Sequence, residues 1–146
     1  QIILEQAQDL HNNRVNKKDS YDVSDFDISF ARGLSLEDGV STLTDFTASI
    51  ISESLVEIFT KNKFNVKEIL LCGGGRKNKI LINKIEKKIS NKIKFELIDK
   101  YGIDGDFIES QAFGFLAIRS LKKLPISFPS TTGCKTPTIG GELINN

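Results

Sequence analysis

The sequence is poor in residues that carry metal or redox chemistry. Its 146 residues include two cysteines and one histidine, and neither tryptophan nor methionine. Cys72 and Cys134 lie far apart with no histidine near them, so no spacing typical of zinc ligands can be read. Cys72 follows an apolar run and is interpreted as a small buried residue. His11 lies in a polar stretch and is interpreted as a surface residue. No metal site is therefore expected.

The chain also lacks an excess of one charge and a long apolar run. Twenty Lys and Arg residues balance 19 Asp and Glu residues, which leaves a net charge of +1. The densest lysine run, residues 84–94, is interleaved with apolar helix positions, so it indicates a solvated face and no nucleic-acid partner. No signal peptide or stretch of about 18 apolar residues is present, so a cytoplasmic protein without a membrane partner is expected. The hydrophobic content of 39% suits one globular domain.

Residues 1–34 are predicted to be a mostly irregular N-terminal segment. A short helix is predicted at Ile2–Leu10 and a loop at Asn12–Ser20. The alternation of polar and apolar residues at Asp25–Phe30 predicts a short strand. The chain begins with Gln1 rather than Met, and nothing in this segment could start a core of its own. We therefore expect the sequence to begin inside a longer protein.

The rest of the chain is organised around a glycine turn. Apolar residues 69–72 precede Gly73, Gly74 and Gly75, a pattern that predicts a buried strand followed by a tight turn. A helix follows, whose apolar face is formed by Leu81, Ile82, Ile85 and Ile89. Glycines allow close approach to the backbone, and a helix N-terminus offers N–H groups to a phosphate or a nucleotide edge. Neither the dinucleotide fingerprint nor the P-loop can be read, so a nucleotide site and a plain turn both stay open.

A long amphipathic helix is predicted from Ser35 to about Phe59. Ser35 can accept a hydrogen bond from the amide of Asp38, whose carboxylate can reach back to the cap. The apolar stripe expected to pack on a sheet or on other helices comprises Val40, Leu43, Thr47, Ile50, Ile51, Leu55 and Ile58. A second strand is predicted at residues 94–98, parallel to the strand at residue 69, because a helix connects the two.

A further helix is predicted from about Asp106 to Leu121, after a second glycine-bearing turn. It is apolar on nearly every face, so it should be buried. Glu109 is its one notable polar residue. A buried carboxylate one turn from a helix N-terminus is either part of a site or is stabilised by the helix dipole. Both interpretations stay open. Residues 124–135 read as a rigid loop that contains prolines.

Three sequence blocks, together with the helix entry at residues 34–40, carry a family resemblance. The blocks are residues 71–78, 105–113 and 124–141. In this order they resemble the C-terminal part of the anhydro-N-acetylmuramic acid kinase family, from about Tyr21 to Ile144. The resemblance implies an α/β fold of the sugar kinase, Hsc70 and actin superfamily. Residues 35–146 would be an incomplete ribonuclease-H-like (actin-like ATPase) C-terminal subdomain, with long helices packed on a small parallel sheet.

The resemblance further implies an ATP-dependent carbohydrate kinase. The reaction would convert anhydro-N-acetylmuramic acid, ATP and water to N-acetylmuramic acid 6-phosphate and ADP in peptidoglycan recycling. The implied cofactors are ATP and magnesium, and the partners are the small-molecule sugar and ATP. By the same resemblance Gly73, Gly74, Gly75 and Asn78 would lie beside the adenosine, and Glu109 would reach the sugar.

The motif that holds the family's catalytic aspartate, Asp-x-Gly-Pro-Gly-Asn, cannot be found in this chain. No residue here is therefore assigned a catalytic role. Because phosphoryl transfer needs groups on both sides of a cleft, the chain alone is expected to be inactive. Two alternatives remain: a nucleotide-binding module without catalysis, and a parallel-sheet fragment whose glycines only form turns. The resemblance also leaves open a homodimer of the full-length protein.

Overall fold

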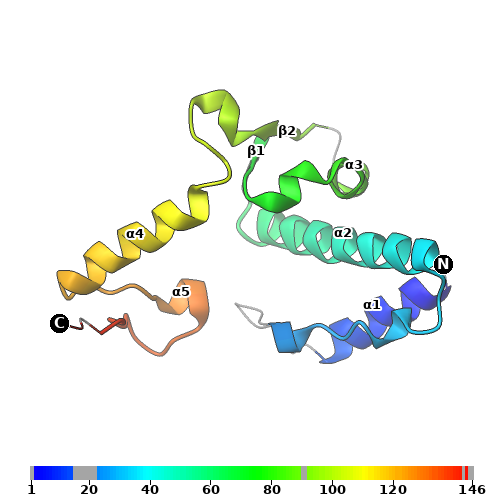
Figure 1. Cartoon of the computed structure of the whole chain (residues 1–146), viewed down its shortest axis with the longest axis horizontal. Helices are drawn as coiled ribbons and strands as arrows, with labels where there is room; N and C mark the ends of the chain where they lie inside the picture. Colours follow the sequence, from blue (N-terminus) through cyan, green and yellow to red (C-terminus); the bar gives the residue numbers. More distant parts are fainter. Residues whose placement is uncertain (1, 15–22, 90–91, 143, 145–146) are drawn as a thin grey trace.

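The chain folds as helices around a two-stranded parallel sheet (Figure 1). The computed structural model describes residues 2–14, 23–89, 92–142 and 144. Its helices and strands are α1 (Ile2–Arg14), α2 (Leu36–Lys61), β1 (Glu68–Leu71), α3 (Lys79–Lys88), β2 (Lys94–Leu97), α4 (Ile108–Leu121) and α5 (Pro129–Thr132). Short 3-10 turns lie at Val23–Asp25, Ser29–Ala31, Gly74–Lys77 and Ile98–Tyr101. In Figure 1, α2 and α3 lie below the sheet, and α4 and α5 extend to one side.

The sheet confirms the predicted parallel pairing. Ile69 lies opposite Phe95 and Leu71 opposite Leu97, and α3 connects the two strands. The expectation of a buried strand was wrong, since Leu70 is 44% exposed. The reason is that β1 and β2 make up the whole sheet in the described part of the chain. Such a small sheet has little surface for helices to cover.

The start of α2 also agrees with the prediction. The Ser35 hydroxyl oxygen accepts a hydrogen bond from the Asp38 amide at 3.1 Å. The same hydroxyl donates to the Asp38 carboxylate at 2.9 Å, so both side chains take part in the cap. The helix then runs to Lys61, two residues beyond the predicted end.

The hydrophobic core lies between α2 and α3. Ala48, Ile85 and Ile89 are buried there, and the residues packed around them are Leu55, Leu81, Ile82, Ile93 and Phe95. The predicted apolar face of α3 is therefore confirmed. The predicted stripe of α2 was partly wrong, because Val40 and Ile58 are about half exposed, at 56% and 47%. The buried α2 positions are instead Phe46, Ala48, Ser49 and Ser52. These positions are covered because α2 contacts α1 as well as α3.

The N-terminal segment differs most from the sequence expectations. Helix α1 extends beyond Leu10 to Arg14, and the rest of the predicted loop, residues 15–20, lies outside the described residues. The strand predicted at residues 25–30 was wrong. Asp27 accepts a hydrogen bond from the Ser29 amide at 2.8 Å, and such local side-chain bonds compete with strand pairing. 

His11 is another correction in this segment. It is 8% exposed rather than on the surface. Its ring stacks on Phe26 at 5.4 Å and meets Phe46 edge-on at 5.8 Å. The polar sequence around His11 gave no sign of these aromatic neighbours, because Phe46 reaches it from α2.

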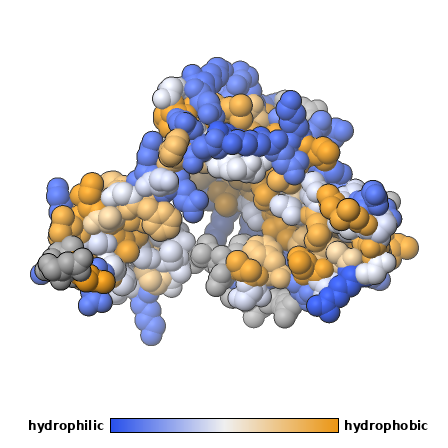
Figure 2. Space-filling model, in the orientation of Figure 1, coloured by the Kyte–Doolittle hydropathy of each residue, from blue (hydrophilic) through white to orange (hydrophobic). Residues whose placement is uncertain are grey.

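Helix α4 corrects the expectation of a buried helix. It begins at Ile108, and none of its residues is buried. Phe113 and Phe115 are 64% and 59% exposed. No described element covers the helix extensively, and apolar surface is visible over this side of the molecule (Figure 2). None of the helices in the described residues is long and apolar enough to cross a membrane.

Candidate functional site

Two loops meet at one edge of the sheet. The first, Gly73–Asn78, follows β1, and the second, Asp99–Phe107, follows β2. Because the strands are parallel, their carboxyl ends lie at the same edge, where open α/β sheets commonly bind ligands. The Gly73 amide donates a 2.8 Å hydrogen bond to the Gly105 carbonyl oxygen. The loops are therefore joined through their backbones.

The glycine turn has an open surface. Gly73 has a φ of 72°, a conformation that favours glycine. A Cβ atom added to Gly73, Gly74 or Gly75 would meet nothing within 4 Å. Only Gly73 is therefore required by the backbone, and the other two leave open space above the turn. A flat or anionic ligand could approach the main chain there.

Asn78 begins α3. Its side-chain Oδ1 accepts a hydrogen bond from the Leu81 amide at 3.1 Å, which caps the helix. The amides of Lys79 and Ile80 precede the first intrahelical hydrogen bonds and remain donors at the positive end of the helix. Asn78 also borders a hollow of about 440 Å³ between the first turns of α2 and α3. The structure thus gives Asn78 a capping role and leaves its amide nitrogen as the group that could reach a ligand.

The side chain of Arg76 extends from the loop after β1 to the loop after β2. Its Nη1 donates to the Gly73 carbonyl oxygen at 2.9 Å, and its Nε donates to Asp99 Oδ2 at 3.3 Å. It also forms a short ion pair with Asp106, whose other oxygen pairs with Lys77 at 2.8 Å. The Arg76 side chain is only 7% exposed. We call Arg76, Lys77, Asp99, Gly105 and Asp106 the Arg76 cluster.

The charges of the Arg76 cluster shift its pKa values. The hydrogen bonds from Arg76 and then Lys77 lower the pKa of the Asp106 carboxyl to about 2. The Gly105 amide, followed by Arg76, lowers the pKa of Asp99. The bond to Asp106 is the main cause of a raised pKa at Arg76. All three groups therefore stay charged at neutral pH.

Gly105 is buried inside the Arg76 cluster. A Cβ atom there would lie 2.8 Å from Arg76 Nε and 3.0 Å from Asp99 Oδ2. A glycine is needed because the guanidinium packs directly against the backbone. Sequence reasoning did not identify Arg76 as important. The available signal was an arginine directly after the glycines, with an acidic turn at the end of the paired strand.

Glu109 takes no part in the Arg76 cluster. It lies in the first turn of the exposed helix α4, three residues after Asp106. The argument for a buried carboxylate was therefore wrong, because no described element packs over this helix turn. The structure brings Gly73, Gly74, Gly75 and Asn78 together at the β1 loop. Glu109 lies apart from these four residues, in α4, which follows the loop after β2.

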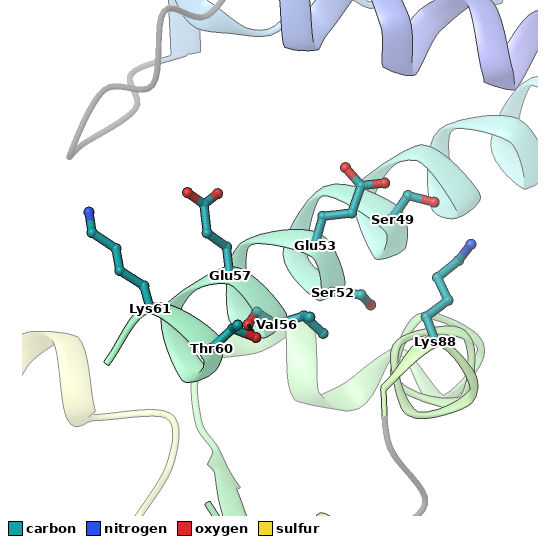
Figure 3. A pocket seen from close by; sticks show the side chains of 8 residues that line it. All are labelled: Ser49, Ser52, Glu53, Val56, Glu57, Thr60, Lys61 and Lys88. Carbon is teal, nitrogen blue, oxygen red and sulfur yellow. Dashed lines mark hydrogen bonds between the residues drawn. The ribbon is translucent and has the colours of Figure 1, made fainter. Parts of the chain in front are cut away.

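A larger groove lies elsewhere, along α2. It has a volume of about 830 Å³ and is bordered by Lys88 of α3 (Figure 3). Ser49 lines this groove, and its buried hydroxyl has no hydrogen-bond partner among the described residues. None of the predicted site residues lines it. Size alone therefore does not make it the candidate site.

The described residues contain no group of three or more His, Cys, Asp and Glu side chains that could hold a metal ion. Near the glycine turn, Asp99 and Asp106 are already paired with cations. Cys72, predicted to be buried, is exposed, because it follows the last residue of β1 at the edge of the small sheet. The carboxylates nearest the glycine turn are thus engaged by Arg76 and Lys77.

Comparisons with known proteins converge on one family. The sequence model for anhydro-N-acetylmuramic acid kinase matches residues 22–146. A protein of that name from Pelagibacter ubique is 51% identical over 147 residues, which cover 100% of this chain and 39% of the relative. Proteins of the same name from Brucella anthropi and Rhizobium rhizogenes are 38% and 41% identical, and the matches cover 86% and 85% of this chain. They span 32% of each of these two relatives, so the chain corresponds to about a third of their length.

Proposed function

The chain belongs to the anhydro-N-acetylmuramic acid kinase family, and on this premise we propose that it forms the nucleotide-facing portion of an ATP-dependent sugar kinase. The reaction of the whole protein would consume anhydro-N-acetylmuramic acid, ATP and water. It would release N-acetylmuramic acid 6-phosphate and ADP in peptidoglycan recycling. Bound ATP would supply the phosphoryl group. A cytoplasmic location remains part of this proposal.

The observation that carries the proposal is the open glycine turn at the carboxyl end of β1. Gly73, Gly74 and Gly75 have free space above them, and α3 begins directly afterwards. These features support contact with the adenosine or the phosphates, with Asn78 at the border. Magnesium would come with the ATP phosphates, since the described residues offer no metal cluster.

Glu109 is the residue we propose for the sugar. Of the four acidic residues in or next to the second loop, Asp99 is bound to Arg76, and Asp106 is bound to Arg76 and Lys77. Asp104 Oδ1 accepts a hydrogen bond from the Asp106 amide at 2.9 Å. Glu109 is exposed and joins no ion pair among the described residues, so its carboxylate can accept hydrogen bonds from sugar hydroxyl groups.

A nucleotide-binding module without catalysis is the second candidate. The observation that favours it is the engagement of both cluster carboxylates in ion pairs. The Gly105 amide and then Arg76 lower the pKa of Asp99, and Arg76 and then Lys77 lower the pKa of Asp106, so both carboxylates are poor general bases. On this interpretation the chain holds ATP and transfers nothing.

The test is a calorimetric titration of the folded chain with a non-hydrolysable ATP analogue and magnesium. We expect saturable binding that Gly75→Val weakens at least tenfold, by about 1.4 kcal/mol. A Cβ atom at Gly75 would meet nothing within 4 Å, so this variant should fold normally. Gly114→Val in α4 is the matched control, because its Cβ position is equally open.

Two outcomes would contradict the proposal. A folded chain that binds no ATP analogue would remove the nucleotide site. Binding that Gly75→Val and Gly114→Val weaken equally would remove the glycine turn from it. A coupled kinase assay of the isolated chain tests whether it catalyses phosphoryl transfer by itself. We expect the isolated chain to phosphorylate no sugar, and clear turnover would rule out a module without catalysis.

A further inference from the structure

The Arg76 cluster connects two loops that are far apart in the sequence. Arg76 comes from the loop after β1, whereas Asp99, Gly105 and Asp106 come from the loop after β2. Asp106 lies two residues before the first residue of α4. A single side chain thus contacts the glycine turn and the entrance to the helix that bears Glu109.

The contacts form a closed set around one guanidinium. Arg76 donates to the Gly73 carbonyl oxygen and to both acidic side chains, and the Asp99 carboxylate accepts from the Gly105 amide at 3.3 Å. The Gly105 carbonyl oxygen in turn accepts from the Gly73 amide. Both backbone polar groups of Gly73 are therefore tied to the second loop or to Arg76. The orientation of the turn depends on this arrangement.

We propose that Arg76 is a positioning residue that holds the Gly73–Gly75 turn in a fixed register with the start of α4. The inference rests on the proposed nucleotide role of the turn. Its functional consequence is that the surface facing the nucleotide and the helix carrying Glu109 form one unit. Arg76 itself faces the protein, with its side chain 7% exposed, and it acts on the nucleotide only through the backbone of the turn.

Charge and shape both matter in this role. A guanidinium can bond two carboxylates and a carbonyl oxygen together because its N–H groups have a fixed planar geometry. Lysine keeps the charge but not this geometry, and glutamine keeps neither. The series Arg76, Arg76→Lys and Arg76→Gln should therefore show a graded loss. If Arg76 only filled space, the loss would not follow this order of charge and geometry.

The experiment measures two properties on the 146-residue chain: hydrogen exchange of the Gly73 amide and affinity for the ATP analogue with magnesium. In Arg76→Gln we expect the Gly73 amide to exchange at least tenfold faster and the affinity to fall about tenfold. Arg76→Lys should lie between this variant and the parent chain in both properties. Protection of the Ile85 amide, in the core of α3, should not change.

Two further variants distinguish the loss of the Arg76 cluster's contacts from a general loss of stability. Gly105→Ala keeps the arginine at position 76, but the new Cβ atom would displace its guanidinium. This variant should therefore reproduce the effects of Arg76→Gln. Arg119→Gln is the matched control. Arg119 donates to the Pro125 carbonyl oxygen in another part of the chain, so the Gly73 amide should keep its protection.

The outcomes distinguish this inference from the proposed function. Unchanged Gly73 exchange and unchanged affinity in Arg76→Gln would overturn the positioning role. Faster Gly73 exchange with unchanged affinity would overturn the link to the nucleotide. If the parent chain binds no nucleotide while Gly73 protection still follows the graded series, the proposed function fails and the fixed register is supported.

Discussion

The α2–α3 region and the α4 arm, residues 108–142, both contain apolar helices, but they use them differently. In the first, α3 places Ile85 and Ile89 against Ala48 of α2, and both isoleucines are 4% exposed. In the second, no residue of α4 is buried. The comparison shows that an apolar pattern specifies a helix but does not supply the surface that covers it. Covering needs a second element at the right distance, and the described part of the chain supplies one for α3 but not for α4.

The largest expected effect comes from truncating one apolar side chain in each region. Ile85→Ala should lower the free energy of unfolding by about 2–5 kcal/mol, because it leaves a cavity in the core. Phe113→Ala should change it by less than about 0.5 kcal/mol, because that side chain already faces solvent. Urea denaturation of the two variants measures the difference. Similar losses would mean that α4 is packed in solution.

The exposed face of α4 should cause the chain to self-associate. Ile118 and Leu121 are one turn apart and are 55% and 63% exposed. Replacing both by serine should weaken self-association about tenfold, or by about 1.4 kcal/mol. Sedimentation velocity over a concentration series measures this. Ile58→Ser is the control, since Ile58 is also exposed but lies on α2. A monomer at every concentration, or an equal effect of the control, would contradict the prediction.

The two helices also differ at their first residues. Asn78 caps α3 with its side chain, whereas Phe107 precedes α4 and forms no such bond. Asn78→Ala should therefore lower stability by about 1 kcal/mol, measured by thermal unfolding without nucleotide. Phe107→Ala has no cap to remove and should show a smaller loss. A larger loss at Phe107 would show that its ring packs against a surface.

The smallest effect should come from acid. The folded-state pKa of Asp106 is lowered from 3.8 to about 2. A lowered pKa contributes stability that is present above the unfolded value and is lost as the pH falls through the folded value. Stability should thus decline between about pH 4 and pH 2. In Asp106→Asn this part of the decline should disappear. Denaturation at a series of pH values tests it, and an identical decline in both proteins would contradict the assignment.

Local sequence patterns predicted the parts of the fold that depend on neighbouring residues. The Ser35 cap, the apolar face of α3 and the parallel strands were confirmed. The strand expected at residues 25–30, the surface position of His11 and the burial of α4 were wrong. The strand was lost to a local hydrogen bond between Ser29 and Asp27, whereas the other two depend on which distant element lies nearby. His11, for example, is buried by Phe46, which is far away in the sequence.

In the candidate site, too, features formed by neighbouring residues could be predicted and features formed by distant residues could not. The glycine turn could be recognised because its residues are consecutive. The Arg76 cluster could not, because Arg76 meets Asp99 and Asp106 across 23 and 30 positions of sequence. Only the pairing of β1 with β2 brings these loops to one edge. Whether Gly73, Gly74, Gly75, Asn78 and Glu109 bind ligands stays a prediction.

The position of the core has a consequence for synthesis on the ribosome. Among the described residues, the α2–α3 core cluster and the layer packed around it lie between Ala48 and Phe95. Proteins are made from the N-terminus at about 5–20 residues per second, and the earlier part of a chain can fold first. The α2–α3 region can therefore form its core while α4 is still inside the ribosome. Helix α4 then emerges after that core has folded, with its apolar side chains exposed.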